Sequence, residues 1–276
     1  GFIEKKGLKV ITSLDVKLQE MVQKIVTDEV NNNAYLNLSN GASLITNPGN
    51  GDILAMVGSK DFYDPNGGNV NVTTSLRQPG ASIKVVTYSA AISKGLTAAT
   101  ILDDAPITYT LPGSPPYSPV NYDGRLYGKL PLRQALANSL NIPAVKTLNQ
   151  IGVPTMVDLG KQMGITTWDD PSQYGLSITL GGADVTMLDM ATVYGVLANN
   201  GIRVDINPIL KVSDQEGNIL EQKQKDPLLQ GKKVVDEGIT FIISNILSDN
   251  MARSLAYGSN SLLNIPSFGY SISFLI

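Results

Sequence analysis

Lys84 lies in the stretch RQPGASIKVVTYSAAI, where a base and a nucleophile could share a helix face, but the position three residues earlier holds only Ala81. Residues three apart on a helix point to the same side. A serine at position 81 could hydrogen-bond to the lysine amine, and burial would lower the pKa of that amine enough for it to accept the serine proton. The methyl group of Ala81 cannot do this. Ser82 is no replacement, because it points to the opposite side of the helix.

A second candidate is the segment NSLN, from Asn138 to Asn141, directly after a short predicted helix. Ser139 and Asn141 are two residues apart in a turn, so both side chains could point into one cleft. A hydroxyl there could relay a proton, and an amide could hold a substrate carbonyl or orient the lysine. In the alternative interpretation these polar groups only satisfy a helix C-terminus, and Lys84 is one surface lysine among many.

The composition limits the available chemistry. The 276 residues contain no cysteine and no histidine, which excludes thiol nucleophiles, the Ser-His-Asp arrangement and most transition-metal sites. A base must therefore come from lysine, a carboxylate or tyrosine, and we expect no metal and no cofactor. The formal charge of −3 argues against a nucleic-acid partner, since no lysine or arginine cluster compensates for it. No apolar run reaches the roughly 18 residues of a membrane span.

The elements that must position these residues can be predicted from hydrophobic periodicity. Residues 15–33 should form an amphipathic helix with one apolar face, made of Leu18, Met21, Val22, Ile25, Val26 and Val30. A β-hairpin is predicted for ASLITNPGNGDILAMVGS, and a loop then leads to Arg77. The next helix should continue from Lys84, with Gly95 as its C′ residue.

The rest of the chain is predicted to alternate helices with loops. The segment from Asp103 to Lys129 is rich in Pro, Gly, Tyr and Ser and should form surface loops, in which Asp103 and Asp104 are solvated. Helices are predicted for LPLRQALANSLN, with a break after Asn138, and for VPTMVDLGKQMG and DEGITFIISNILSDN. Another helix should begin at a capping box of Thr186 and Asp189, after a turn at GGAD, and KVSDQEGNILEQK should form a second hairpin. These elements predict an α+β domain.

Several stretches together resemble the transpeptidase domain of class A (bifunctional) penicillin-binding proteins. They follow the family's order over nearly the whole chain: GLKVITSLDVKLQ, NPGNGDILAMVGS, RQPGASIK, ANSLNIPAVK, LGGADVTMLDMATVYGVLANNGIRV and SDNMARSLAYGSNSLLNIP. The first family motif, S-x-x-K after Gln-Pro-Gly, is matched except that Ala81 occupies the serine's place. The second motif, S-x-N, is matched by Ser139 and Asn141. The third motif, K-T-G, does not occur in the sequence.

The resemblance implies the α+β fold of penicillin-binding proteins and serine β-lactamases, with a central antiparallel sheet flanked by helices. We expect residues 1–276 to form one transpeptidase domain, in which residues 1–33 are the leading segment and first helix. Because K-T-G is missing and SFGYSISFLI follows Pro266, the C-terminal strands of that sheet should be incomplete. The family's glycosyltransferase domain and membrane anchor are expected outside these residues, and the location is the extracytoplasmic face of the bacterial cell membrane.

The resemblance also implies an activity. Enzymes of this family attack the D-Ala-D-Ala end of a peptidoglycan stem peptide, hold the acyl group as a serine ester and transfer it to an amine of a neighbouring strand. β-Lactams imitate the dipeptide and acylate the same serine. By this resemblance Lys84 would be the base, Ser139 would carry the proton to the leaving nitrogen, and Asn141 would hold the substrate amide. The backbone N–H of Ala81 would form half of the oxyanion hole.

Three hypotheses follow for this sequence. The first is a peptidoglycan D,D-transpeptidase domain inactivated by a deliberate alanine substitution at position 81, which should form no covalent penicillin adduct. The second is a natural pseudoenzyme that serves as a binding module among cell-wall synthesis proteins. The codon of the natural gene distinguishes these two. The third is a β-lactamase or β-lactam sensor, although no glutamate is obviously placed to activate a deacylating water.

Overall fold

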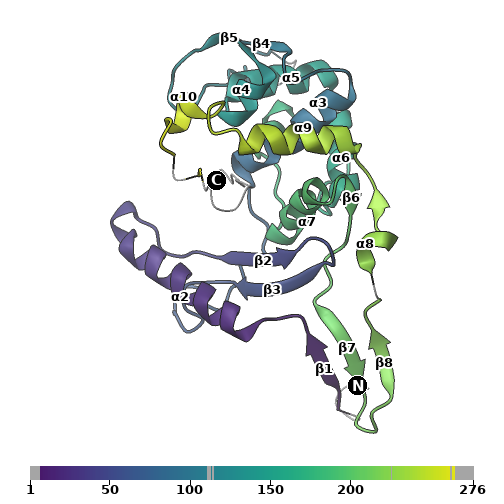
Figure 1. Ribbon diagram of the computed structural model, residues 1–276. Coiled ribbons are helices and arrows are strands. Elements are labelled where there is room, and N and C mark those ends of the chain that lie inside the picture. Colours follow the sequence, from purple (N-terminus) through teal and green to yellow (C-terminus); the bar gives the residue numbers. More distant parts are fainter. Residues whose placement is uncertain (1–6, 111–112, 114, 225, 262, 265–276) are drawn as a thin grey trace. The chain divides into compact units, whose positions relative to one another are not determined.

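The chain forms two compact units, and both combine helices with short antiparallel strands. Unit 1 consists of the described residues of Gly1–Arg77 and Thr186–Lys233, and unit 2 of those of Gln78–Val185 and Val234–Ile276. The mixture of helices and strands confirms the predicted α+β class. The computed structural model (Figure 1) describes residues 7–110, 113, 115–224, 226–261 and 263–264.

Unit 1 is built around antiparallel strand pairs. The pairs are β1 with β7, β7 with β8, β2 with β3, and β6 with β9. In chain order its elements, with η for 3₁₀-helices, are β1 (Lys9–Thr12), α2 (Val16–Asn32), η1 (Ala34–Leu36), β2 (Ser43–Asn47), β3 (Asp52–Val57), α7 (Met187–Ala198), β6 (Ile202–Arg203), β7 (Ile209–Ser213), β8 (Ile219–Gln222), α8 (Pro227–Gln230) and β9 (Lys232–Lys233).

The predicted hairpin of β2 and β3 is the centre of unit 1. Helix α2 packs against β3 and helix α7 against β2, so that Figure 1 shows the hairpin between the two helices. Asp15 caps α2 by accepting a hydrogen bond from the N–H of Leu18, and α7 begins at the predicted capping box of Thr186 and Asp189. Among the described residues, this two-stranded hairpin is the antiparallel sheet that has a helix packed on each strand, as expected for the central sheet of the fold.

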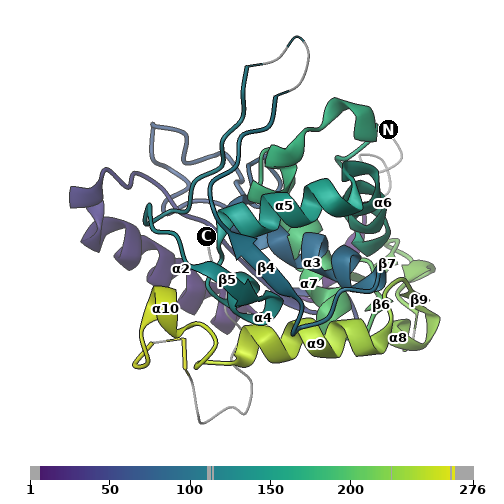
Figure 2. The same cartoon turned by 90° about the horizontal axis from the view of Figure 1, so that it is seen from above.

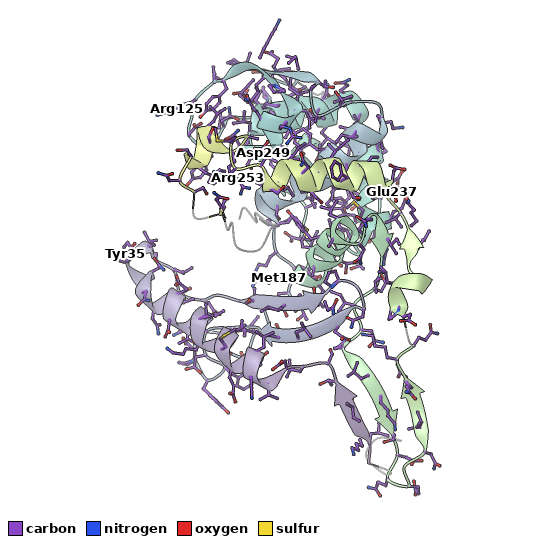
Figure 3. The ribbon with its side chains drawn as sticks, viewed as in Figure 1. Tyr35, Arg125, Met187, Glu237, Asp249 and Arg253 are labelled. Atoms are coloured by element: carbon purple, nitrogen blue, oxygen red, sulfur yellow. The ribbon has the colours of Figure 1, made fainter. Side chains whose placement is uncertain are left out.

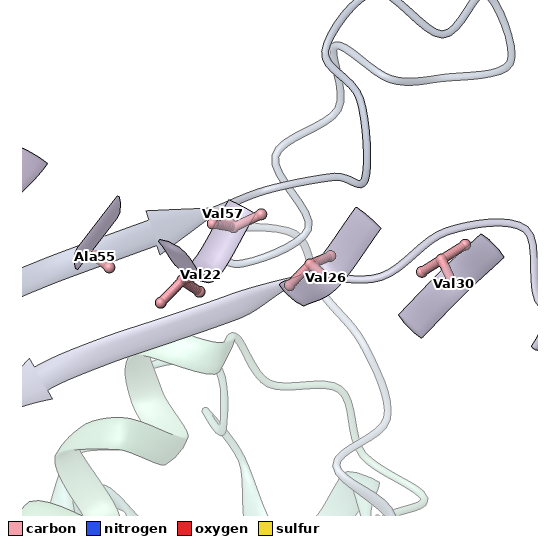
Figure 4. Close-up of a cluster of buried hydrophobic side chains, with 5 residues drawn as sticks. All are labelled: Val22, Val26, Val30, Ala55 and Val57. Atoms are coloured by element: carbon pink, nitrogen blue, oxygen red, sulfur yellow. The ribbon is translucent and has the colours of Figure 1, made fainter. Parts of the chain in front are cut away.

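The face of α2 that contacts the hairpin is narrower than predicted. Its buried residues are spaced four apart and pack on β3 in one cluster (Figure 4), made of Val22, Val26, Val30, Ala55 and Val57. The predicted apolar face also included Met21 and Ile25, but these side chains are 54% and 51% exposed. They lie about 100° around the helix axis from the buried line. The two strands cover only that line.

The three-stranded sheet of unit 1 is fastened to the hairpin by polar side chains. Lys223 donates from Nζ to Asp52 Oδ1 at 2.7 Å and to the carbonyl oxygen of Asn207 at 2.6 Å. Ser13 Oγ donates to the carbonyl oxygen of Ile53 at 2.8 Å and accepts from the N–H of Ile53 at 3.1 Å. The second predicted hairpin, β7 with β8, is confirmed.

Unit 2 contains the residues with candidate chemistry. Its elements are η2 (Gly80–Ile83), α3 (Lys84–Ser93), β4 (Ile101–Asp104), β5 (Gly128–Pro131), α4 (Leu132–Ala137), α5 (Asn141–Ile151), α6 (Val153–Met163), η3 (Pro171–Gln173), η4 (Leu176–Leu180), α9 (Glu237–Ser248) and α10 (Ser254–Tyr257). Helix α3 lies at the centre, in contact with α5, α6 and α9 (Figures 1 and 2). Residues 84–91 of α3 are all buried, as expected for a helix that is surrounded on every side.

Two features of unit 2 were not predicted. Strands β4 and β5 pair across the segment that was expected to be loop only. Helix α5 was not predicted. Pro143 is compatible with it, because the residue lies in the first turn, where a backbone N–H would have no partner within the helix.

The expected incompleteness of the C-terminal strands concerns residues 267–276, which lie outside the described residues. Within the part of the chain that the structure describes, no helix combines the length and apolar character needed to cross a membrane. The strand pairs described in unit 2 are β4 with β5 and an isolated bridge between Tyr109 and Tyr117.

The packing of α2 predicts a difference between two substitutions on the same helix. Val26→Ala removes two buried methyl groups and should lower the free energy of unfolding by about 2 kcal/mol. Met21→Ala, at an exposed position, should change it by less than about 0.5 kcal/mol. Urea unfolding followed by far-UV circular dichroism measures both. Equal losses would mean that the helix buries a wider face than the structure describes.

Candidate active site

Lys84 follows directly on the turn that contains residue 81. Residues 80–83 form the 3₁₀-helix η2, and the N–H of Lys84 donates to the carbonyl oxygen of Ala81. Side chains three residues apart in a 3₁₀-helix are nearly eclipsed, so positions 81 and 84 point to the same side. Ser82 instead donates from Oγ to the carbonyl oxygen of Pro79 at 2.6 Å.

The amine of Lys84 is buried without a countercharge. The residue is 1% exposed, so the alternative interpretation of a surface lysine is wrong. Burial lowers the pKa of Lys84 to about 7, because removal from water disfavours the ammonium form. Among the described residues, the ion pairs involve other lysines and arginines. Near neutral pH a large fraction of this amine is therefore uncharged and able to accept a proton.

Three uncharged oxygen atoms surround the amine. Lys84 Nζ donates to Ser139 O at 2.5 Å, to Asn141 Oδ1 at 2.7 Å and to Ser139 Oγ at 3.1 Å. The structure thus brings Lys84, Ser139 and Asn141 together from positions more than 50 residues apart in sequence. An ammonium group has three hydrogens, one for each acceptor.

Ser139 reaches the lysine through an uncommon backbone conformation. Its φ of 53° is in the left-handed region, which costs an L-residue about 1 kcal/mol. The residue lies between the end of α4 and the start of α5, and both its carbonyl oxygen and its hydroxyl contact the amine. Strain of this kind is typical of functional sites.

Asn141, the first residue of α5, has a fixed amide orientation. Its Oδ1 accepts from Lys84, and its Nδ2 donates to the carbonyl oxygen of Val120 at 2.8 Å. The amide nitrogen carries two hydrogens, so one bond to Val120 leaves the second to bind a carbonyl group of a ligand. The arrangement can therefore orient a lysine and a substrate with one side chain.

Asn138 anchors the same turn on its other side. Its Nδ2 donates to the carbonyl oxygen of Ala252 at 2.7 Å, and its Oδ1 accepts from the N–H of Ala256 at 2.9 Å. The segment it contacts follows α9, where Figure 3 shows Asp249 and Arg253. The sequence pattern alone assigned no separate role to Asn138.

The GGAD segment packs beneath the turn at residue 81, which the sequence analysis did not predict. A Cβ atom added at Gly181 would lie 2.2 Å from the nitrogen of Gly80, and the φ of Gly181 is +86°. Only glycine permits both the close approach and this backbone conformation. The two adjacent glycines, Gly181 and Gly182, were the feature of the sequence that could have predicted this close packing.

The acidic residues are arranged differently from the prediction. Asp103 is half exposed and pairs with Lys146, but Asp104 is fully buried, so the expectation that both are solvated is wrong for Asp104. Within the described ranges, no group of three or more acidic side chains is arranged to hold a metal ion.

Comparison with known proteins identifies the family. A model of the penicillin-binding protein transpeptidase domain matches residues 41–266. The chain belongs to this family. The match runs through both units and includes Ala81, Lys84, Ser139 and Asn141. It confirms the resemblance inferred from the sequence motifs.

Several curated relatives are similar over most of this chain. Penicillin-binding protein 1A of Neisseria lactamica is 36% identical over 232 residues, which cover 82% of this chain and 28% of that protein. Penicillin-binding protein 2D of Bacillus subtilis is 32% identical over 252 residues, covering 89% of this chain and 34% of that protein. The chain therefore spans about a third of the length of these relatives.

Solved structures support the fold. Penicillin-binding protein 1A of Haemophilus influenzae matches with a TM-score of 0.66 and 29% identity, over 77% of this chain and 35% of that chain. The penicillin-binding protein PonA1 of Mycobacterium tuberculosis matches with a TM-score of 0.75 and 21% identity, over 95% of this chain and 67% of that chain. The predicted penicillin-binding protein fold is confirmed.

Gly181→Ala should destabilise unit 2 by more than about 2 kcal/mol, because the methyl group meets the backbone of Gly80 and the positive φ adds strain. Gly175→Ala is the matched control, since its added Cβ has no atom within 4 Å and its φ is −101°. The single tryptophan, Trp168, lies in unit 2, so its fluorescence during urea unfolding reports on this unit. Similar unfolding midpoints for the two variants would contradict the close packing at Gly181.

Lys84 should make the stability depend on pH between about 7 and 10.5. In that window the unfolded chain binds one proton more than the native state, so the free energy of unfolding rises with pH by about 1.4 kcal/mol per unit. Lys84→Met should lack this slope, and Lys24→Met, at an exposed lysine, should keep it. Urea unfolding across this range, followed by circular dichroism, measures the slopes. Parallel curves for the parent and Lys84→Met would refute the lowered pKa.

Proposed function

We propose that this chain is a peptidoglycan D,D-transpeptidase domain in which alanine replaces the nucleophilic serine at position 81. The observation that carries the proposal is the buried amine of Lys84, which has no ion-pair partner within the part of the chain that the structure describes and is held by the S-x-N segment one 3₁₀-turn from residue 81. Family membership and the names of the relatives support the same reaction class. The family match spans parts of both units, which supports a single transpeptidase domain over residues 1–276.

With serine at position 81, the reaction begins at the carbonyl carbon of the penultimate D-alanine. The serine oxygen bonds to that carbon while the neutral amine of Lys84 takes the hydroxyl proton. The backbone N–H of residue 81 stabilises the negative charge that develops on the carbonyl oxygen. Asn141 holds the amide of the stem peptide through its second Nδ2 hydrogen.

The leaving group then needs a proton. The proton on Lys84 passes through the hydroxyl of Ser139, 3.1 Å away, to the nitrogen of the terminal D-alanine, and the C–N bond breaks. An amine of a neighbouring strand next attacks the ester carbon and gives one proton to Lys84; the amide cross-link forms, the C–O bond to serine breaks, and Lys84 returns the proton to the serine oxygen. A β-lactam reacts in the same way: its ring C–N bond breaks and the nitrogen takes the proton, but that nitrogen stays tethered to the acyl group through the rest of the molecule, and the ester persists.

With Ala81 the reaction cannot proceed beyond substrate binding. Without the hydroxyl no ester can form, while the amine and the amide of Asn141 remain available for reversible contacts. The proposed substrates are stem peptides that end in D-Ala-D-Ala, with β-lactams as mimics. The proposed location is the extracytoplasmic face of the bacterial cell membrane, where peptidoglycan is cross-linked.

Restoring serine at position 81 should restore acylation. The Ala81→Ser variant, incubated with a fluorescent penicillin, should gain one ligand mass in intact-mass spectrometry, and the parent chain should gain none. The double variant Ala81→Ser with Lys84→Met should also stay unlabelled, because the base is gone. An adduct on the parent chain, or no adduct on Ala81→Ser, would refute the proposed function.

A further inference from the structure

Asn121 is a buried amide in an otherwise exposed part of the segment between β4 and β5. Its exposed fraction is 4%, whereas those of its neighbours Val120 and Tyr122 are 69% and 104%. A buried amide is retained when its hydrogen bonds are satisfied. The contacts of Asn121 therefore define what it does.

One half of the amide caps helix α5. Asn121 Oδ1 accepts from the N–H of Asn141 at 2.8 Å and from that of Ile142 at 3.3 Å. These backbone groups lie in the first turn and have no partner inside the helix. The residue at the N-cap position, Leu140, makes no side-chain capping bond. Asn121 supplies from a distant segment the acceptor that a local serine or aspartate usually provides.

The remaining orphan groups of this helix start are also accounted for. The N–H of Leu140 donates to the carbonyl oxygen of Ala135 at 3.0 Å, and Pro143 has no N–H. The two N–H groups that remain at this helix start belong to Asn141 and Ile142, and both donate to Asn121. The position of the first turn of α5 therefore depends on Asn121. The first residue of that turn is Asn141, whose side chain contacts Lys84.

The other half of the amide is held by Asp104. The carboxylate oxygens of Asp104 accept from Asn121 Nδ2 at 2.9 and 2.8 Å, and one of them accepts from the N–H of Tyr127 at 2.8 Å. Because a carboxylate accepts hydrogen bonds and does not donate them, Nδ2 must face Asp104 and Oδ1 must face α5. Asp104 thus fixes the amide of Asn121 in the orientation that caps the helix, together with the carbonyl oxygen of Arg125, which accepts from the same Nδ2 at 2.8 Å.

We propose that Asn121, oriented by Asp104, is a positioning residue for acyl transfer. It fixes the start of α5, and through it the amide of Asn141 between Lys84 and the substrate carbonyl. Asn121 touches neither the lysine nor residue 81 in the described contacts, so it acts through Asn141. The inference rests on the proposed function, because it gives Asn121 a part in the same reaction.

The test uses Asn121→Leu in two backgrounds. In the Ala81→Ser background, the acylation rate constant with a fluorescent penicillin, per folded protein, should fall about tenfold or more, since Asn141 is no longer held. In the parent chain, the titration midpoint of Lys84, read from ¹³Cε-labelled lysine by NMR, should fall by about 0.5 pH unit or more as Asn141 Oδ1 withdraws from the ammonium.

Two further variants separate positioning from general damage. Asn149→Leu, at an exposed position on the same helix, should leave both readouts within about twofold and 0.2 pH unit of their starting values. Asp104→Asn keeps a side-chain oxygen that can accept from Asn121 Nδ2, and should lower the acylation rate less than Asn121→Leu does. If Asn121→Leu fails to fold, Asn121→Ser replaces it, with the same directions expected.

The outcomes separate the inference from the function. An unchanged Lys84 midpoint, or an acylation rate within twofold of the Ala81→Ser variant, would overturn the role of Asn121. Failure of Ala81→Ser to acylate at all would overturn the proposed function instead. In that case the Lys84 midpoint in the parent chain still decides whether Asn121 positions the amide.

Discussion

The burial of one amine, with no opposing charge beside it among the described residues, is the constraint on which the centre of unit 2 depends. Transferring an ammonium group out of water is costly unless other groups replace its hydration. Here a carbonyl, an amide oxygen and a hydroxyl do so for Lys84. Because all three are neutral, they orient the amine without holding its proton as a carboxylate would. The same arrangement that makes burial tolerable therefore keeps Lys84 able to act as a base.

The three polar residues of NSLN each bind a different part of the unit. Asn138 holds the segment after α9, Ser139 contacts the lysine, and Asn141 joins the lysine to the segment before β5. This division explains why Ser139 tolerates a left-handed backbone, since the residues on both sides of it are fixed. Gly181 lets its segment pack closely on the turn at residue 81, since an added Cβ would meet the backbone of Gly80.

Local patterns were sufficient to predict the hairpins, the capping box of α7 and most helices. Spacing and motifs also led to Lys84, Ser139 and Asn141. They could not show that Lys84 is buried, because burial is decided by the helices packed around α3. Asp104 and Asn121 were missed for a related reason: each looked like an ordinary loop residue, and their partners lie about 20 residues away. Helical periodicity likewise predicted too wide an apolar face for α2, because the pattern of the helix contains no information on the width of the sheet that packs against it.

The contacts of Asn138 have a consequence for the order of folding. Its partners Ala252 and Ala256 are 114 and 118 residues further along the chain. Closing so long a loop is entropically costly, and contacts of this range tend to slow folding. A growing chain that has not yet reached residue 256 lacks one of the two anchors of the turn that receives the lysine. The turn that receives the lysine is therefore completed only after the segment of Ala252 and Ala256 has docked on Asn138.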